Sequence, residues 1–241
     1  MNGYMRNPPT MKKLDFDTEF LRGIREALPV VIGFIPFALV LGAQSVAKGL
    51  SVIEIPMMTG LNFGGGSEFV AINLWTNPPQ ILLIVFMSIL VNSRHILMGA
   101  TLSPYIRHLP KRKVLPSLFL MCDESWAMAL SDIKNKGVFS LNYYLGVSLF
   151  LYFTWVIFTA LGACLAPYIG NLEQFGFDMA FTAVFLVLLK GMWKNFSSSF
   201  PWAISLIIAC FTYAYIPGAW YVLTGSIAGL AFSYIKGPQN D

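Results

Sequence analysis

The segment Ile55–Trp75, IPMMTGLNFGGGSEFVAINLW, is an apolar run of membrane-spanning length with a polar break at its centre. A helix needs about 20 mostly apolar residues to cross a bilayer. The consecutive glycines Gly64–Gly66 interrupt such a helix, because glycine loses the most backbone freedom on folding. Glu68 follows directly, and a carboxylate at that depth is costly and marks a functional site by default. The segment therefore predicts two half-helices that meet at a polar site inside a membrane.

Seven more apolar segments accompany this one. Two of them also have polar centres, around Arg94 and around Asp123-Glu124, whereas the last four are almost free of charge. Pro36 should kink the first, which neighbouring helices can accommodate in a membrane. The segments are Ala27–Ala47 before the break and, after it, Pro79–Ser103, Val114–Leu130, Leu141–Cys164, Phe177–Leu189, Ser197–Tyr215 and Trp220–Ile235.

The composition places the whole chain in a membrane. Of its 241 residues, 56% are hydrophobic and 12% charged, against about a quarter charged in soluble domains; the mean hydropathy is +0.64. The net charge of +4 comes from short basic loops beside apolar segments. Such residues set membrane topology, so nucleic-acid binding is not expected. Three cysteines in apolar stretches show no metal-ligand spacing, and we expect neither a metal nor another cofactor.

The loop charges predict how the segments cross the bilayer. Every basic cluster falls on the cytoplasmic side if Ile55–Trp75 and Val114–Leu130 each enter and leave on one face. The prediction is an all-α integral membrane fold with about six full transmembrane helices and two broken, re-entrant segments. Re-entrant segments that enter from opposite faces are typical of an inverted repeat. The basic clusters lie before Ala27, at Arg107–Lys113, at Lys134 and Lys136, at Lys190 and Lys194, and at Lys236.

We expect one transmembrane transporter domain, residues 27–236, between two short flanking segments. Residues 1–26 form a cytoplasmic N-terminal segment, and residues 237–241 form a C-terminal tail. Both termini of this multi-pass membrane protein are expected to be cytoplasmic.

Five ionisable residues lie within the apolar segments: Glu68, Arg94, His95, Asp123 and Glu124. Arg94 is always charged and needs a partner or a wet cavity. Asp123 and Glu124 are its nearest candidate partners in sequence and Glu68 is the third, and the ion pair is either functional or purely structural. Adjacent residues on a helix point about 100° apart, so we expect one acid to pair with Arg94 and the other to titrate. A histidine can carry a proton, so His95 is either a proton carrier or a hydrogen-bonded packing residue.

A substrate site is predicted at the glycine-rich break. Free N–H groups at the start of a half-helix suit a carboxylate ligand, although the glycines can instead permit close helix packing. The candidate substrate-binding residues are Asn62, Gly64, Gly65, Gly66, Ser67, Glu68 and Trp126, and the candidate coupling or ion-pair residues are Arg94, His95, Asp123 and Glu124. We expect this machinery within the first 136 residues, with the later helices as scaffold and Trp155 among the interfacial anchors.

Three stretches resemble motifs of a known family. Asn62–Val70 (NFGGGSEFV) resembles its small-residue "GAS-Q-F" motif, and Asn92–Gly99 (NSRHILMG) resembles its "R-H-x-L-x-G" motif. Asp123–Ala127 (DESWA) resembles its "D-E-x-aromatic-A" motif. In this order and spacing they resemble the AzlC family, the large subunit of branched-chain amino acid exporters. The resemblance covers roughly Glu26 to Lys136; the later helices match only in hydropathy and length.

This resemblance implies a secondary transporter of a bacterial inner (plasma) membrane rather than an enzyme. It implies export of branched-chain or similar apolar amino acids, coupled to proton entry, with a small AzlD-type four-helix membrane subunit as partner. Glu68 departs from the glutamine usual in the family. A deprotonated carboxylate there repels a substrate carboxylate, but it suits a substrate ammonium or the coupling proton. The resemblance also implies that Glu68→Gln keeps transport.

Two other functions fit parts of the pattern. Two re-entrant half-helices that meet at mid-membrane also describe a passive channel for small solutes. An intramembrane hydrolase would use Ser67 or Ser93 with His95, although residues adjacent in sequence do not face one another on a helix.

Overall fold

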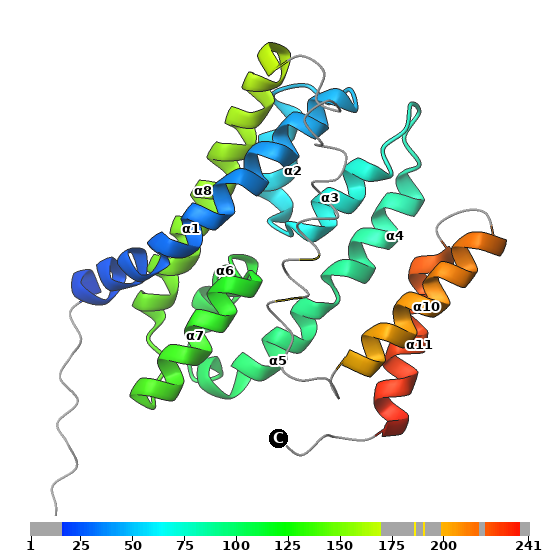
Figure 1. Ribbon diagram of the computed structural model, residues 1–241. Helices are drawn as coiled ribbons and strands as arrows, with labels where there is room; N and C mark the ends of the chain where they lie inside the picture. The colour runs from blue at the N-terminus through cyan, green and yellow to red at the C-terminus, as the bar shows by residue number, and fades with distance from the viewer. Residues whose placement is uncertain (1–15, 170–185, 187–189, 191–198, 217–219, 237–241) are drawn as a thin grey trace, which may run out of the picture. The chain divides into compact units, whose positions relative to one another are not determined.

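A computed structural model describes residues 16–169, 186, 190, 199–216 and 220–236, and all regular secondary structure within these ranges is helical (Figure 1). The chain divides into two compact units, residues 1–181 and 182–241. The expected all-α fold is confirmed. The predicted span Phe177–Leu189 lies almost entirely outside the described residues.

Helices α1 (Phe16–Ala47) and α8 (Leu141–Ile169) form the long central pair of the first unit (Figure 1). Contacts advance along both helices together, from Gly23 against Tyr143 to Gly42 against Thr159, so the helices run parallel. At each contact a Cβ on the glycine would collide with the backbone of the facing helix. The absence of a side chain therefore lets the two backbones approach closely, as small residues do between membrane helices.

The second apolar segment forms two short helices, α2 (Glu54–Asn62) and α3 (Gly66–Asn73). Phe63 (φ 45°) and Gly65 (φ 51°) both have left-handed backbone dihedral angles, which end α2 and redirect the chain into α3. Contacts with α8 descend from Thr159 at Thr59 to Tyr152 at Phe63, so α2 runs antiparallel to α8. The glycine-rich break thus lies beside the middle of α8.

The turn before α2 is closed by two hydrogen bonds between the same two residues. The Ser51 backbone N–H donates to the Glu54 carboxylate at 2.7 Å, and the Glu54 N–H donates to the Ser51 hydroxyl at 3.3 Å. Because the Ser51 N–H favours the charged carboxylate, it lowers the pKa of Glu54.

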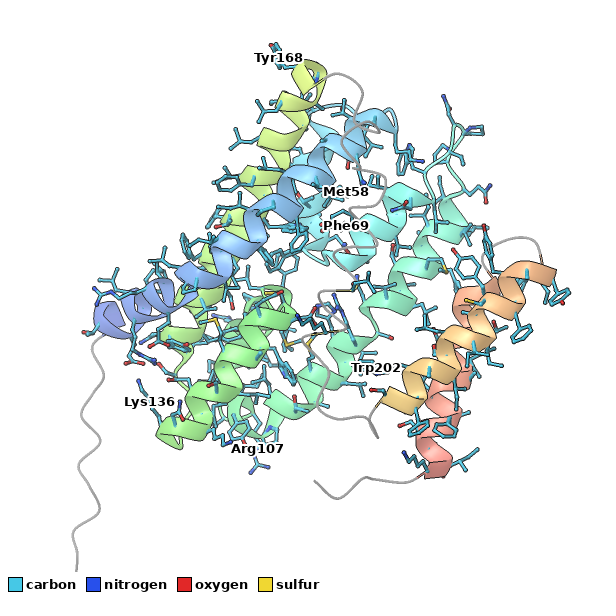
Figure 2. The ribbon with its side chains drawn as sticks, in the orientation of Figure 1. Met58, Phe69, Arg107, Lys136, Tyr168 and Trp202 are labelled. Atoms are coloured by element: carbon cyan, nitrogen blue, oxygen red, sulfur yellow. The ribbon has the colours of Figure 1, made fainter. Side chains whose placement is uncertain are left out.

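The third segment forms α4 (Ile81–Asn92) and α5 (Arg94–Ile106), interrupted at Ser93. The fourth forms α6 (Lys111–Phe119) and α7 (Asp123–Lys136). α6 reaches Tyr144 of α8 at Ser117 and Tyr152 at Phe119, so it rises along α8. α7 returns to the start of α1, where Lys136 contacts Glu19. Figure 2 shows Arg107 and Lys136 at one end of this unit and Tyr168 at the other.

The second unit contains α10 (Phe200–Tyr215) and α11 (Trp220–Lys236). They form an antiparallel pair, since Thr212 hydrogen-bonds Thr224 while Gly229 packs on Pro201 and Ser205.

Among the described residues, three stretches are long and apolar enough to cross a membrane: Thr18–Ala47, Ile81–Ile106 and Leu141–Tyr168. They correspond to the predicted segments 27–47, 79–103 and 141–164. α1 begins at Phe16 and continues through Pro29 and Pro36, so the end of the expected N-terminal segment is helical.

Candidate functional site

Glu68 is the buried centre of the glycine-rich break. It lies in the first turn of α3 and is 1% exposed. Its Oε1 accepts hydrogen bonds from the Gly64 N–H at 3.0 Å and from Asn62 Nδ2 at 3.4 Å. Its Oε2 accepts one from Trp155 Nε1 at 2.7 Å. The three N–H donors compensate the desolvation of this carboxyl group, which would otherwise be expensive.

The backbone N–H groups proposed for a substrate carboxylate are largely used within the protein. The Gly64 N–H donates to Glu68, the Ser67 N–H donates to the Gly64 carbonyl, and the Glu68 N–H donates to the Gly65 carbonyl. Glu68 itself therefore takes the place that the sequence suggested for a ligand carboxylate.

Gly64 has no room for a side chain. A Cβ there would collide with Ser67 Oγ and would lie 2.7 Å from Asn62 Nδ2 and 2.9 Å from Asn92 Oδ1. These polar atoms form one network, because Asn92 Nδ2 donates to Asn62 Oδ1 at 3.3 Å and Asn62 Nδ2 donates to Ser67 Oγ at 2.9 Å. The network connects α4 to the break.

Arg94 joins the two broken segments. Its Nη1 lies 2.6 Å from Asp123 Oδ2 at the start of α7, and its Nη2 donates to the Gly64 carbonyl at 3.4 Å. The sequence suggested either acid as its partner, and the structure pairs it with Asp123. Within the described residues, the ion pairs at this site do not include Glu124. The breaks in α2–α3, α4–α5 and α6–α7 therefore meet around one guanidinium group.

α8 contributes to the site through two residues that the sequence reading assigned to the scaffold. Tyr152 donates to the Gly60 carbonyl at 2.7 Å, and its ring contacts Phe63 and Phe119 beside both breaks. Trp155 is 3% exposed and binds Glu68, so its expected place as an interfacial anchor is wrong. The candidate site therefore includes side chains from beyond the first 136 residues, to which the sequence prediction confined it. Trp155 lies in the middle of its apolar segment rather than at an end, which was the signal available.

An open cavity of about 450 Å³ lies next to the break, along one face of α4. Branched aliphatic side chains form its apolar part, and amide and hydroxyl groups form its polar part. The residues that line it are Ile84, Val85, Ile89 and Ile96, together with Asn62, Ser88, Asn92 and Ser93. Only Asn62 of the predicted site residues lines this cavity.

The remaining predicted residues lie elsewhere around the breaks. His95 Nδ1 is 3.1 Å from the Asn92 carbonyl, and within the described residues no hydrogen bond joins its ring to Ser67 or Ser93. This arrangement lacks the nucleophile–base contact that a hydrolase needs. Trp126 donates to Thr101 at 2.8 Å and packs against the apolar cluster that contains Met98 and Leu102, away from the residues that line the cavity.

A second charged cluster, which the sequence reading did not identify, connects α7 to the start of α1. Arg22 pairs with Glu19 at 2.7 Å and Asp132 at 3.0 Å, and Lys136 pairs with Glu19 at 3.0 Å. Glu19 is 4% and Asp132 7% exposed. The cluster fixes the returning end of α7 to the long α1–α8 pair.

The sequence matches one known protein family. Residues 29–169 match the AzlC family, described as "AzlC protein". The chain is 27% identical over 157 residues to "Inner membrane protein YgaZ" of Escherichia coli (strain K12), covering 64% of each chain. It is 28% identical over 169 residues to "Branched-chain amino acid transport protein AzlC" of Bacillus subtilis (strain 168), covering 70% of this chain and 65% of that one.

A further relative has no assigned activity in its name. The chain is 30% identical over 182 residues to an "Uncharacterized membrane protein" of Archaeoglobus fulgidus, covering 74% of this chain and 78% of that one. The chain spans slightly less than two thirds of the length of the Escherichia coli and Bacillus subtilis relatives. No solved structure matches it.

The family match extends from within α1 to the end of α8, so it includes all three breaks, Arg94, Glu68 and Trp155. It covers more than half of the chain. The protein therefore belongs to the AzlC family of membrane proteins.

Proposed function

We propose that this chain is the large subunit of a two-component secondary transporter that exports branched-chain or similar apolar amino acids. Membership of the AzlC family and the name of the Bacillus subtilis relative, a branched-chain amino acid transport protein, support this function.

The cavity beside α4 is the observation that carries the proposal. Its aliphatic residues suit a branched hydrocarbon side chain, and Asn62, Asn92 and the two serines can hydrogen-bond an amino acid's charged groups. A site that is mostly apolar with a few polar groups is typical of small-molecule recognition. The substrate therefore lies against α4, with its polar end toward the break.

The proposed topology has about six full spans and two re-entrant pairs, α2–α3 and α6–α7. α2 descends along α8 from the end of the unit where Tyr168 lies, whereas α6 rises from the opposite end. These opposite directions support an inverted repeat. The positive-inside rule places the end that carries Arg107 and Lys136 in the cytoplasm, together with both termini.

Proton entry drives export in this proposal, and a small AzlD-type four-helix subunit completes the complex. Glu68, Glu124 and His95 are the titratable candidates for the coupling proton. Arg94 keeps the two re-entrant tips together through Asp123 and the Gly64 carbonyl, which suits a site that alternates between the two membrane faces.

Efflux from whole cells tests the proposal. Cells that lack the gene should become sensitive to valine- or leucine-containing dipeptides and accumulate the free amino acid. Restoring the chain with its partner should restore uphill efflux, and an uncoupler should abolish that efflux. Unchanged tolerance and unchanged efflux would contradict the proposal, while efflux that only follows the concentration gradient would indicate a channel.

Two α4 variants test the cavity itself. Val85→Phe places a larger side chain in the cavity, whereas Leu82→Phe makes a similar change on the same helix at a position that is 87% exposed and does not line it. We expect Val85→Phe to lower leucine export about tenfold or more, which corresponds to roughly 1.4 kcal/mol of lost binding. Equal export by the two variants would place the substrate elsewhere.

A further inference from the structure

Every hydrogen-bond partner of the Glu68 carboxyl group in the described structure is a donor. The Gly64 N–H and Asn62 Nδ2 approach Oε1, and Trp155 Nε1 approaches Oε2. Trp155 and Glu68 are 3% and 1% exposed, so water cannot readily replace either partner. Each carboxyl oxygen of Glu68 therefore has its own donors: Gly64 and Asn62 of the break bind Oε1, and Trp155 of α8 binds Oε2.

This arrangement sets a chemical requirement at position 68. A backbone N–H and an indole N–H are donors only, whereas a carboxylate accepts hydrogen bonds at both oxygens. A glutamine offers one acceptor oxygen and one NH₂ group. In either orientation its NH₂ group would face the Gly64 N–H or the Trp155 N–H, which leaves a buried donor without an acceptor. Trp155 thus makes the site selective for glutamate.

Trp155 is itself held firmly in place. Its ring lies 4.8 Å from that of Phe34 on α1, between the two long parallel helices. Glu68 connects Trp155 to the cavity. Asn62 donates a hydrogen bond to Glu68 and accepts one from Asn92, and both asparagines line the cavity.

We propose that Trp155 is a positioning residue for transport: it orients Glu68, and through Glu68 it sets the polar wall of the cavity that Asn62 and Asn92 form. Trp155 and Glu68 act as a matched pair, so glutamine at position 68 is tolerated only when the indole N–H is removed. This inference rests on the proposed function for its transport readout, but not for its stability readout. It reverses the expectation from the family resemblance that Glu68→Gln alone keeps transport.

A double-mutant cycle tests the pairing in the full chain with its partner subunit. The variants are Glu68→Gln, Trp155→Phe and the double variant, with Trp126→Phe and Glu68→Gln/Trp126→Phe as matched controls. Trp126 donates to Thr101, not to Glu68, so its removal should give no rescue. The measurements are the KM and maximal rate of leucine export in cells, and the Tm of the purified protein.

We expect Glu68→Gln to reduce export about tenfold or more, mainly through KM, and Trp155→Phe to reduce it only a few-fold. The double variant should export better than Glu68→Gln, because the glutamine NH₂ group no longer faces the indole N–H and residues in direct contact are not additive. It should export less than Trp155→Phe, because that NH₂ group is still buried without an acceptor. The Tm values should show the same rescue. A rise in KM at near-normal maximal rate distinguishes positioning from general destabilisation.

Three results would overturn the inference: wild-type export by Glu68→Gln, a double variant whose losses simply add, or equal rescue by Trp126→Phe. Failure of the proposed function is a separate result, in which the wild-type chain exports no amino acid. In that case the Tm cycle still decides whether Trp155 and Glu68 are a matched pair.

Discussion

The guanidinium of Arg94 and the carboxylate of Asp123 lie 2.6 Å apart, and this ion pair joins the starts of α5 and α7. Each side chain is 35% exposed, so the pair contributes only about 1 kcal/mol or less to stability. Its larger effect is geometric, because the same guanidinium also holds the Gly64 carbonyl. The break between α2 and α3 and the start of α7 are thereby held at the same guanidinium group.

Arg94→Lys tests this geometric function. A lysine keeps the charge but lacks the planar fork that reaches Asp123 and Gly64 together. We expect export to fall about tenfold or more while the Tm changes little, since the charge–charge attraction persists. Arg107→Lys at the end of α5 is the matched control and should export normally. Normal export by Arg94→Lys would show that charge alone suffices.

Gly64→Ala should damage the site because its Cβ has no space. The colliding atoms belong to the side chains of Ser67, Asn62 and Asn92, which can shift at the cost of their hydrogen bonds. We expect a loss of about 1–2 kcal/mol in stability, together with a severe loss of export. Gly33→Ala in α1 is the control, since nothing lies within 4 Å of its Cβ. Full export by Gly64→Ala would show that Asn62 and Asn92 do not contribute to substrate binding.

Gly42→Ala should lower stability more than Gly64→Ala does. Its Cβ would collide with the backbone of Thr159 and Ala163 on α8, and backbone atoms cannot move without separating the helices. We expect a loss of about 2–3 kcal/mol in stability, larger than that of Gly64→Ala, measured as the Tm of the purified protein. If Gly42→Ala is as stable as Gly33→Ala, the close α1–α8 contact is incorrect.

Arg22→Ala should destabilise the end of α7. Arg22 neutralises the buried acids Glu19 and Asp132, and its loss leaves Lys136 as the partner of both. Removing one member of a buried ion network costs about 3–5 kcal/mol; because Arg22 is 24% exposed, we expect about 2 kcal/mol. The measurement is thermal unfolding in detergent, with the exposed Arg25→Ala as control. Equal Tm values for the two variants would show that the cluster of Arg22, Glu19, Asp132 and Lys136 does not stabilise the fold.

The sequence determined the features that depend on local composition. Apolar length predicts helices at α1, α4–α5 and α8, because a bilayer requires about 20 apolar residues per span. Gly64–Gly66 predicts the break between α2 and α3, since consecutive glycines destabilise a helix; Gly66 itself begins α3, which contains Glu68. The motifs around Glu68, Arg94 and Asp123 also predicted the AzlC family, which the comparison confirmed.

Tertiary structure alone decided which groups meet. Whether Arg94 pairs with Asp123 or Glu124 depends on how α5 and α7 pack, because the two acids differ only by one position on a helix. Trp155 lies 87 residues from Glu68. Its place in the middle of an apolar segment argues against a membrane anchor, but no local feature identifies Glu68 as the acceptor of its indole N–H. The glycine-rich break was therefore predictable from the sequence. That Glu68 takes the place of a ligand carboxylate follows from the folded break, where Gly64 and Asn62 donate to one carboxyl oxygen and Trp155 of α8 donates to the other.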